Sequence, residues 1–280
     1  MSLSNNDYQL RRRAKTDPAR SKPKVESMPG YPLIGRAAMG GAGVHGNGNR
    51  TAMNQRAALV RHFPLFSNIS SADGTEIVSA AHEKAFSRRQ TIFFQGDPIE
   101  QIILLTSGSV KITQVGQNGT EVILRLSGPG DLVGATGLCT RYNHCSTARV
   151  LRSSRALVWG AAAFEALSER FPILRHNAAR ILGEHLRELE ERFREISTEN
   201  VAPRLGREIT RLLNRIGEKC EAGAVKIRLT HEDLAQLTGT TLYTVCRLLS
   251  QWEQQGIVST GREAVMVHDP HALAELSHSE

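Results

Sequence analysis

The chain of 280 residues lacks the features that mark several large classes of protein. It has no run of about 18 apolar residues, so no membrane-spanning helix is expected. No apolar stretch follows the first basic residues, so no secretory signal is expected and a cytoplasmic location is predicted. No nucleophile stands beside a base, no carboxylates form a recognisable catalytic pair, and no glycine-rich loop follows a strand. We therefore expect that the protein is not an enzyme.

Cysteine is scarce, with four residues that form no C-x-x-C pair. This spacing excludes a zinc ribbon and a dithiol redox motif, and no metal site is predicted. In a reducing compartment the thiols are expected to be free. The four positions are Cys139, Cys145, Cys220 and Cys246.

Positive charge is concentrated at the N-terminus. Residues 1–61 hold eleven basic and three acidic residues, whereas the whole chain has a formal net charge of +7, so the remainder is close to neutral. Residues 1–55 also contain too few large apolar residues to offset the entropy of ordering, which predicts a disordered basic arm. Such an arm either attracts nucleic-acid phosphates without specificity or is a solvated leader, and both interpretations stay open.

Short apolar segments separated by turn residues dominate residues 56–170. A helix is expected over residues 76–86, followed by strands. Ser107-Gly108 is expected to form a hairpin turn between two of these strands, and Asn118-Gly119 is a second turn signal. The pattern predicts a small antiparallel barrel or sandwich. The expected strands cover residues 91–94, 102–105, 110–113, 122–124 and parts of 149–159.

Residues 171–200 have the pattern of one long helix. Apolar residues recur at alternating spacings of four and three, which is a heptad seam, and charged residues lie between them. The seam favours a parallel dimer interface, and the alternative is a helix packed on its own domain. The seam residues are Leu182, Leu186, Leu189, Phe193 and Ile196.

Residues 201–280 predict a winged helix-turn-helix. A helix over 204–218 and a strand over 225–227 precede two short helices, and a further strand over 264–267 completes a wing. Thr230 is a good N-cap of the first short helix, and the following Gly239 suits a turn that needs positive φ.

The second short helix has two faces. Val245 is expected to point into the core shared with Ala235, while Thr241 caps the helix. Tyr243 and Arg247 lie on another face, free to enter a major groove. An ordinary helical hairpin is the alternative interpretation.

Four motifs together resemble the Crp/Fnr family of bacterial transcription regulators, over about residues 60–275. The resemblance implies an α+β fold with an antiparallel, jelly-roll-like β-roll sensor (56–170), a dimerisation helix (171–200) and a winged helix-turn-helix (201–280). It also implies a homodimer on palindromic double-stranded DNA, with RNA polymerase as a partner and no membrane association. The motifs are FQGD at 94–97, LTSGSVKI at 105–112, GPGDLVG at 128–134 and LTGTTLYTVCRLL at 237–249.

The residues that the family uses for cyclic AMP are missing. Family members that bind it carry a Gly-Glu pair and then an Arg-Ser pair, whereas this chain has Gly134-Ala135 and His144-Cys145. A neutral imidazole does not replace a bidentate guanidinium on phosphate. Cyclic AMP is therefore not the expected effector.

Iron–sulfur members of the family hold their cluster on four cysteines, most of which precede the β-roll. No cysteine precedes Cys139 here, so no such cluster is expected. Cysteine and histidine are also ligands of haem and metals, and a thiol can itself be a sensor, so a haem- or thiol-based redox or gas-responsive regulator is an alternative. Otherwise Cys139 and Cys145 are small buried thiols that fill the β-roll, and His144 lies in its loop. The candidate effector-pocket residues are Gly134, Ala135, Cys139, His144 and Cys145.

The resemblance also places the DNA contacts. Arg247 matches the family's arginine and is expected to contact O6 and N7 of a guanine, with a discrimination of about 1–3 kcal/mol. Tyr243 stands where well-known members have glutamate, so the remaining bases of the half-site are expected to differ. Oxidation of Cys246 would place bulk or charge against the bases, although a packing role is the alternative. The expected DNA-contacting residues are Arg247, Tyr243, Thr241, Thr244, Cys246, Thr230 and His231.

A function of another class remains. β-rolls of this type also regulate kinases and channels, so the chain could be a signalling module without DNA binding whose C-terminal helices dock on protein. The spacing of Ala235, Gly239 and Val245 favours DNA binding.

Overall fold

A computed structural model describes residues 56–117, 119–134, 143–220 and 223–277. The predicted basic arm and the candidate residues Ala135 and Cys139 lie outside the described residues. All the described residues belong to one compact unit, which spans residues 44–280.

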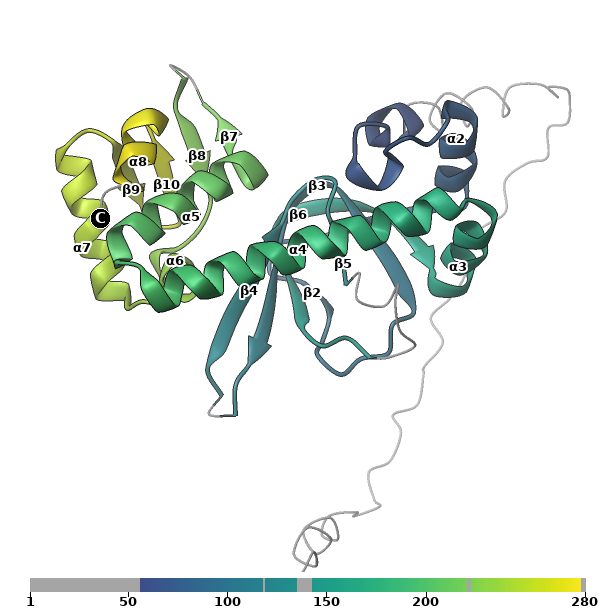
Figure 1. Ribbon diagram of the computed structural model, residues 1–280, viewed down its shortest axis with the longest axis horizontal. Helices are drawn as coiled ribbons and strands as arrows, with labels where there is room; N and C mark the ends of the chain where they lie inside the picture. Colours follow the sequence, from purple (N-terminus) through teal and green to yellow (C-terminus); the bar gives the residue numbers. More distant parts are fainter. Residues whose placement is uncertain (1–55, 118, 135–142, 221–222, 278–280) are drawn as a thin grey trace, which may run out of the picture. The chain divides into compact units, whose positions relative to one another are not determined.

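The N-terminal part is an antiparallel sheet, which confirms the predicted α+β class with a β-roll (Figure 1). Its central path is β1-β6-β3-β4, while β2 pairs with β6 and β5 pairs with β3. The two long strands, β3 and β6, pair over most of their length, which builds a wall that faces two hydrophobic cores. The strands are β1 (His82–Phe86), β2 (Thr91–Phe93), β3 (Gln101–Val115), β4 (Glu121–Ser127), β5 (Leu132–Val133) and β6 (Thr147–Gly160).

The prediction of a helix over residues 76–86 is wrong for the second half of that range. Helix α2 (Ser71–Ser79) ends early, and β1 follows with His82 opposite Val158 of β6. Four of the five residues of β1, His82 to Ala85, have no strong strand propensity, and their ladder with β6 outweighs the local preference. Long-range pairing, which local sequence does not reveal, decides this segment.

The hairpin expected at Ser107-Gly108 is also wrong, because β3 continues through both residues. The register with β6 shifts on either side of Ser107, so the strand bends at a bulge instead of turning back. Gly108 has φ +85°, and a Cβ there would lie 2.3 Å from Ser154 Oγ. A glycine with positive φ therefore occurs at a β-bulge as well as in a hairpin turn, and the sequence does not distinguish the two. The hairpin at Gly119, between β3 and β4, is confirmed.

Helix α4 (Pro172–Thr198) is the long helix predicted by the heptad pattern, and it follows α3 (Ala161–Arg170). Its first half packs into the sensor core through Leu174, Ala178 and Ile181, beside the buried ring of Trp159. Its second half leaves the seam open in the single chain, with Leu186 57%, Leu189 46%, Phe193 73% and Ile196 43% exposed.

The C-terminal part has its own core of aliphatic residues around Trp252, extended by Ile123 and Leu126 of β4. Its four-stranded sheet, of order β7-β8-β10-β9, is the predicted wing region. None of the described helices is long and apolar enough to cross a membrane. The elements are α5 (Val201–Ile216), β7 (Glu218–Lys219), β8 (Val225–Ile227), α6 (His231–Thr238), α7 (Leu242–Gln254), β9 (Val258–Gly261), β10 (Ala264–Val267) and α8 (Pro270–Leu276).

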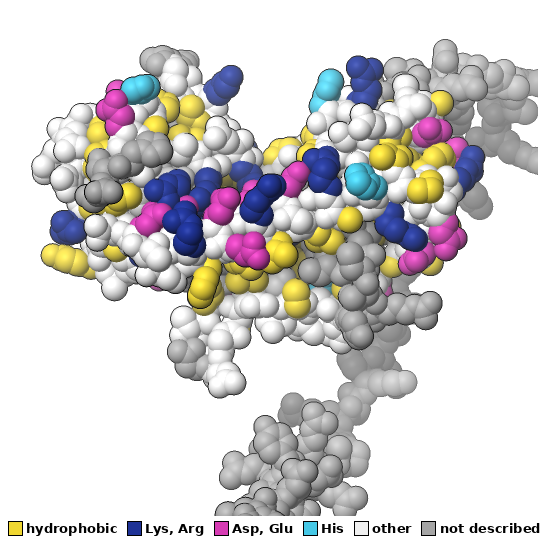
Figure 2. All heavy atoms as spheres, in the orientation of Figure 1, with side chains coloured by type: hydrophobic (Ala, Val, Ile, Leu, Met, Phe, Trp, Pro, Cys, Tyr) yellow, Lys and Arg dark blue, Asp and Glu magenta, His cyan; other side chains and the backbone are white. Residues whose placement is uncertain are grey.

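Helices α4 and α5 are joined by ion pairs, and Figure 2 shows basic and acidic side chains interleaved in a band over them. Glu195 is 2% exposed and pairs with Arg207 and Arg211 of α5. Burial alone would raise the pKa of Glu195, but the two guanidinium groups outweigh it and hold the pKa below its ordinary value. Arg204 donates to the last carbonyls of α4, including Glu199 O at 3.0 Å. These contacts set the end of α4 against the start of the DNA-binding part.

Candidate DNA-reading helices and effector cavity

The turn between α6 and α7 has the geometry predicted from the sequence. Thr230 and Asp233 form a reciprocal capping box at the start of α6. Gly239 adopts a left-handed conformation at φ +59°, and Thr240 N donates to Ala235 O over 3.0 Å. A Cβ at Gly239 would lie 3.3 Å from Ile196 of α4, so the turn is also set against the long helix. Ala235 and Val245 are buried between the two helices.

Helix α7 presents the predicted reading face to solvent. Tyr243 is 78% exposed, and Arg247 is also exposed. Thr241 accepts from Thr244 N over 3.2 Å as the N-cap, and the two hydroxyls lie 2.9 Å apart. These side chains start from the N-terminal turns of the helix, which is the part of a recognition helix that reads base edges.

Cys246 lies beside the same face and is only partly buried. Its Sγ is 3.4 Å from Nδ1 of His231, at the start of α6. The ring's other nitrogen, Nε2, is buried and has no hydrogen-bond partner among the residues that the structure describes. The structure therefore brings together two residues that the sequence named separately.

A cavity of about 360 Å³ lies between the β-roll and α4. Two of the predicted effector-pocket residues, Gly134 and Cys145, line it. Cys145 is exposed, so the alternative in which it is a buried filler of the β-roll is wrong. The described lining residues are Ile112, Gln114, Leu124, Arg125, Gly134, Cys145, Ser146, Leu182, His185, Leu186, Glu188, Leu189 and Arg192.

His144 is not among the lining residues. Its ring is buried and stacks on Phe93, with ring centroids 3.5 Å apart and planes inclined by 6°. Burial lowers the pKa of His144, and the charge of Asp97 only partly opposes this. A neutral ring in an apolar stack is a packing element, and it lies against Gly134, where an added Cβ would be 2.8 Å from the imidazole.

Sequence reasoning missed Arg125 on β4, which supplies a cation to the cavity. Its guanidinium donates to Ser127 Oγ over 2.8 Å and to Leu132 O over 3.2 Å, and it lies 3.4 Å from Nε2 of His185. Burial lowers the pKa of the Arg125 guanidinium, and the negative charge of Asp131 opposes this shift only in part. An arginine inside an Ile-Leu-Arg-Leu strand was the available signal, because a charge within an apolar run calls for a partner.

Arg192 connects the cavity to the DNA-reading part. It lines the cavity from α4, and it donates to Leu124 O of β4 and, over 2.8 Å, to Leu237 O near the end of α6. One guanidinium therefore contacts the sensor sheet and the first reading helix together.

A second chain of contacts runs from His185 through Asp131 to Arg215 of α5. The distances are 4.0 Å between His185 Nε2 and Asp131 Oδ1, and 3.6 Å between Arg215 Nε and Asp131 Oδ2. Burial would raise the pKa of Asp131, but His185 and Arg215 outweigh it and the pKa lies below its ordinary value. Asp131 therefore stays ionised at neutral pH and links the two parts.

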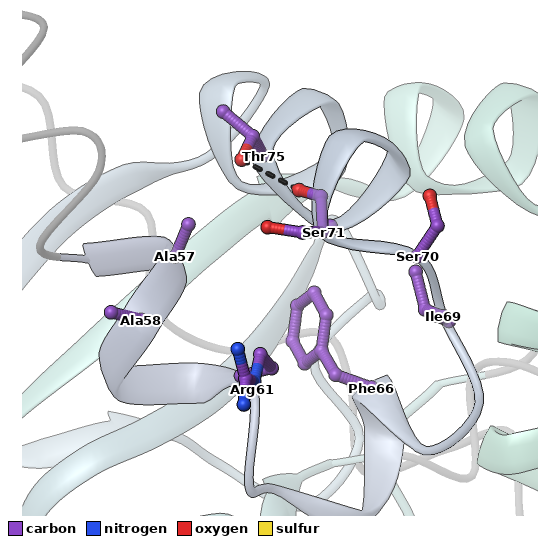
Figure 3. A pocket seen from close by; sticks show the side chains of 9 residues that line it. Ala57, Ala58, Arg61, Phe66, Ile69, Ser70, Ser71 and Thr75 are labelled. Carbon is purple, nitrogen blue, oxygen red and sulfur yellow. Dashed lines mark hydrogen bonds between the residues drawn. The ribbon is translucent and has the colours of Figure 1, made fainter.

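A smaller hollow of about 290 Å³ lies beside α2 (Figure 3). Phe66 stands between the start of α2 and the helical residues 56–60, and Thr75 donates to Ser71 O over 2.8 Å. Arg61 is the one charged residue among its described lining residues. Compared with this hollow, the cavity at α4 has more charged residues and more aliphatic residues in its described lining.

Comparison with known proteins identifies the two parts separately. A family model for the cyclic nucleotide-binding domain matches residues 83–171, and a model for the Crp-like helix-turn-helix domain matches residues 204–276. The chain belongs to the Crp/Fnr family. It is accordingly a helix-turn-helix DNA-binding transcription regulator, as the motifs predicted.

Relatives of this Crp/Fnr protein are themselves regulators. The cyclic AMP receptor protein of Thermus thermophilus is 27% identical over 214 residues, which cover 76% of this chain and 96% of that protein. The anaerobic regulatory protein of Pasteurella multocida is 28% identical over 196 residues, which cover 70% of this chain and 71% of that protein.

Solved structures agree on the fold. FixK2 from Bradyrhizobium japonicum is 20% identical with a TM-score of 0.63, and the match covers 71% of this chain and 98% of that chain. TTHB099, a CRP-family regulator from Thermus thermophilus, is 23% identical with a TM-score of 0.60, and the match covers 70% of this chain and 97% of that chain.

The described residues of this Crp/Fnr chain include no group of three or more histidine, cysteine, aspartate or glutamate side chains that could hold a metal ion. Cys139 is not among the described residues, so the haem- or thiol-based alternative stays a prediction.

Proposed function

We propose that the chain regulates transcription as a homodimer that binds a palindromic operator and takes its signal in the cavity between the β-roll and α4. The exposed seam of α4 carries this proposal, because four large apolar side chains open to solvent on a long helix require a partner. A two-fold dimer presents two α7 helices to two half-sites.

The domain boundaries that we propose follow these roles of sensing, dimerisation and DNA binding. We assign residues 1–55 to a basic arm, 56–170 to the sensor, 171–200 to the dimerisation helix and 201–280 to DNA binding. The protein would act in the cytoplasm, where it meets DNA and RNA polymerase, and it would catalyse no reaction.

The DNA contacts are assigned from exposure and position. Arg247 and Tyr243 would reach base edges, while Thr241 and Thr244 at the start of α7 would position phosphates. Thr230 and His231 lie at the N-terminus of α6, where backbone N–H groups and the helix dipole also favour a phosphate. Cys246 lies between these groups and would contact DNA or support His231.

Cyclic AMP is not the signal in this proposal. The described lining residues include no carboxylate free to accept from a ribose, because Glu188, the acid among them, pairs with Arg215 over 2.7 Å. Where family members that bind cyclic AMP have an arginine, this chain has His144, whose ring is buried and stacked on Phe93.

Selection of bound duplexes from a random DNA pool tests the function directly. We expect enrichment of two inverted half-sites about 10–10.5 base pairs apart from centre to centre, each with a guanine. Fluorescence anisotropy on the enriched duplex at fixed salt should show that Arg247→Ala weakens binding about 5- to 150-fold.

Gln254→Ala, at the exposed far end of α7, is the matched control and should bind as the wild type does. Equal affinity of the wild type for every duplex, with no effect of Arg247→Ala, would refute the proposal and favour a signalling module that docks on protein.

A further inference from the structure

The wall of the α4 cavity divides into an apolar side and a cationic side. Among the described lining residues the apolar side is aliphatic, so this part of the wall offers hydrophobic area and no aromatic ring on which a base could stack. At about 360 Å³ the cavity lies near the small end of the range for ligand sites. The aliphatic residues are Ile112, Leu124, Leu182, Leu186 and Leu189.

On the cationic side, Arg125 has no carboxylate at ion-pair distance among the described residues. Its hydrogen-bond partners are a hydroxyl, a backbone carbonyl and an imidazole nitrogen. The neighbouring carboxylates of Asp131 and Glu188 are both engaged by Arg215. A partly buried guanidinium is stabilised by a directly paired anion, and Arg125 has the negative charges of Asp131 and Glu188 only at longer range, so it is available to a ligand carboxylate.

Arg192, the other arginine in the described lining, already has partners within the protein. It contacts two backbone carbonyls, and its Nε lies 3.6 Å from Glu208, which is 7% exposed. Among the described lining residues, one guanidinium therefore remains for a ligand. A single carboxylate matches it in charge and in fork geometry, whereas a phosphate monoester would bring nearly two charges.

We propose that this cavity binds a small amphipathic carboxylate, whose carboxylate pairs with Arg125 and whose apolar body lies against the leucines of α4. The inference rests on the proposed effector role of the cavity and names the ligand's chemical class. Leu186 and Leu189 belong to the seam as well as to the cavity, so the bound ligand would lie against the interface of the proposed dimer.

Calorimetry on the free full-length protein tests the class, with octanoate and 4-phenylbutanoate as probes and octan-1-ol as the neutral match to octanoate. We expect at least one acid to bind, and octanoate to bind about 10–100-fold more tightly than octan-1-ol, because a hydrogen-bonded charge pair is lost in the alcohol. Arg125→Met should remove that difference while retaining the volume of the side chain.

Arg149→Met is the control, because this arginine lies on the adjacent part of the sheet with 41% of its side chain exposed and does not line the cavity. Circular dichroism verifies that each variant is folded, and the comparison of acid with alcohol in the wild type stands even if Arg125→Met unfolds. Failure of both acids to bind at millimolar concentration, equal binding of octanoate and octan-1-ol, or tighter binding of cyclic AMP than of either acid would overturn the proposal.

Because no DNA is present, these outcomes are independent of the operator experiment. Loss of DNA binding with intact acid binding would refute the proposed DNA-reading role alone. Loss of acid binding with an intact operator would refute the ligand class alone.

Discussion

Replacement of Phe193 by alanine should separate the proposed dimer without unfolding its subunits. The side chain is 73% exposed in the single chain, so its removal leaves the subunit core untouched. A phenylalanine can bury about 150–250 Å², so most of that area is available to a partner helix. At about 25 cal/mol per Å², the exposed part corresponds to about 3–4 kcal/mol in each protomer.

The measurable effect is smaller than this sum, because part of the area stays covered by alanine and association orders side chains. Half of the estimate, lost in both protomers, is about 3–4 kcal/mol per dimer. We therefore expect the dimer dissociation constant to rise about 300-fold.

Sedimentation velocity over a dilution series measures the dissociation constant. Arg187→Ala, at an exposed α4 position outside the seam, is the matched control and should change it less than threefold. A Phe193→Ala protein that dissociates at the same concentration as the wild type, with unchanged circular dichroism, would refute the assignment of the seam.

Three further predictions concern stability, each measured by denaturant unfolding. For His144→Phe, the folded pKa of the wild-type histidine lies below its ordinary value, so the unfolded chain takes up a proton first as pH falls below about 6.5. The wild type should lose stability between pH 7.5 and 5.5, the variant should lose less, and equal losses would contradict this. Gly239→Ala should cost about 1–2 kcal/mol at φ +59°, whereas Gly183→Ala, inside helix α4 and with open space around it, should not destabilise. Glu195→Gln should cost about 1–3 kcal/mol at pH 7, because Arg207 and Arg211 lose their buried anion while each keeps a second one, Glu199 and Glu208. The difference in unfolding free energy between the wild type and Glu195→Gln should narrow as the pH falls below about 4.3. The reason is that Glu195, whose pKa is lowered in the fold, stabilises the fold only while its carboxylate is ionised. A difference that does not change with pH would contradict this role of Glu195.

The parts of the fold that local rules govern were predictable from the sequence. The capping residue Thr230, the left-handed Gly239 and the buried Val245 act within a few residues of themselves, so their types and spacing suffice. The seam on α4 was equally legible, because a heptad period survives whatever the helix packs against.

Features that depend on distant pairing were not predictable. β1 is a strand because it faces β6, more than sixty residues later in the chain, and Gly108 bends β3 because β6 continues to pair on both sides of it. Arg125 was missed for a similar reason: its neighbour His185 lies 60 residues away, on the helix that covers this strand. Local patterns show the polarity of a face but not which element covers it.

The apolar stripe on α4 passes without a break from Leu182, packed against the sensor core, to Phe193, open to solvent. In the proposed dimer, one helix would therefore serve the folding of its own subunit and the pairing of two subunits. Mass action then ties resistance to heat to abundance: the melting temperature should climb as the protein is concentrated and decline as it is diluted. A cell that makes fewer copies of this regulator would also hold each copy in a less durable form.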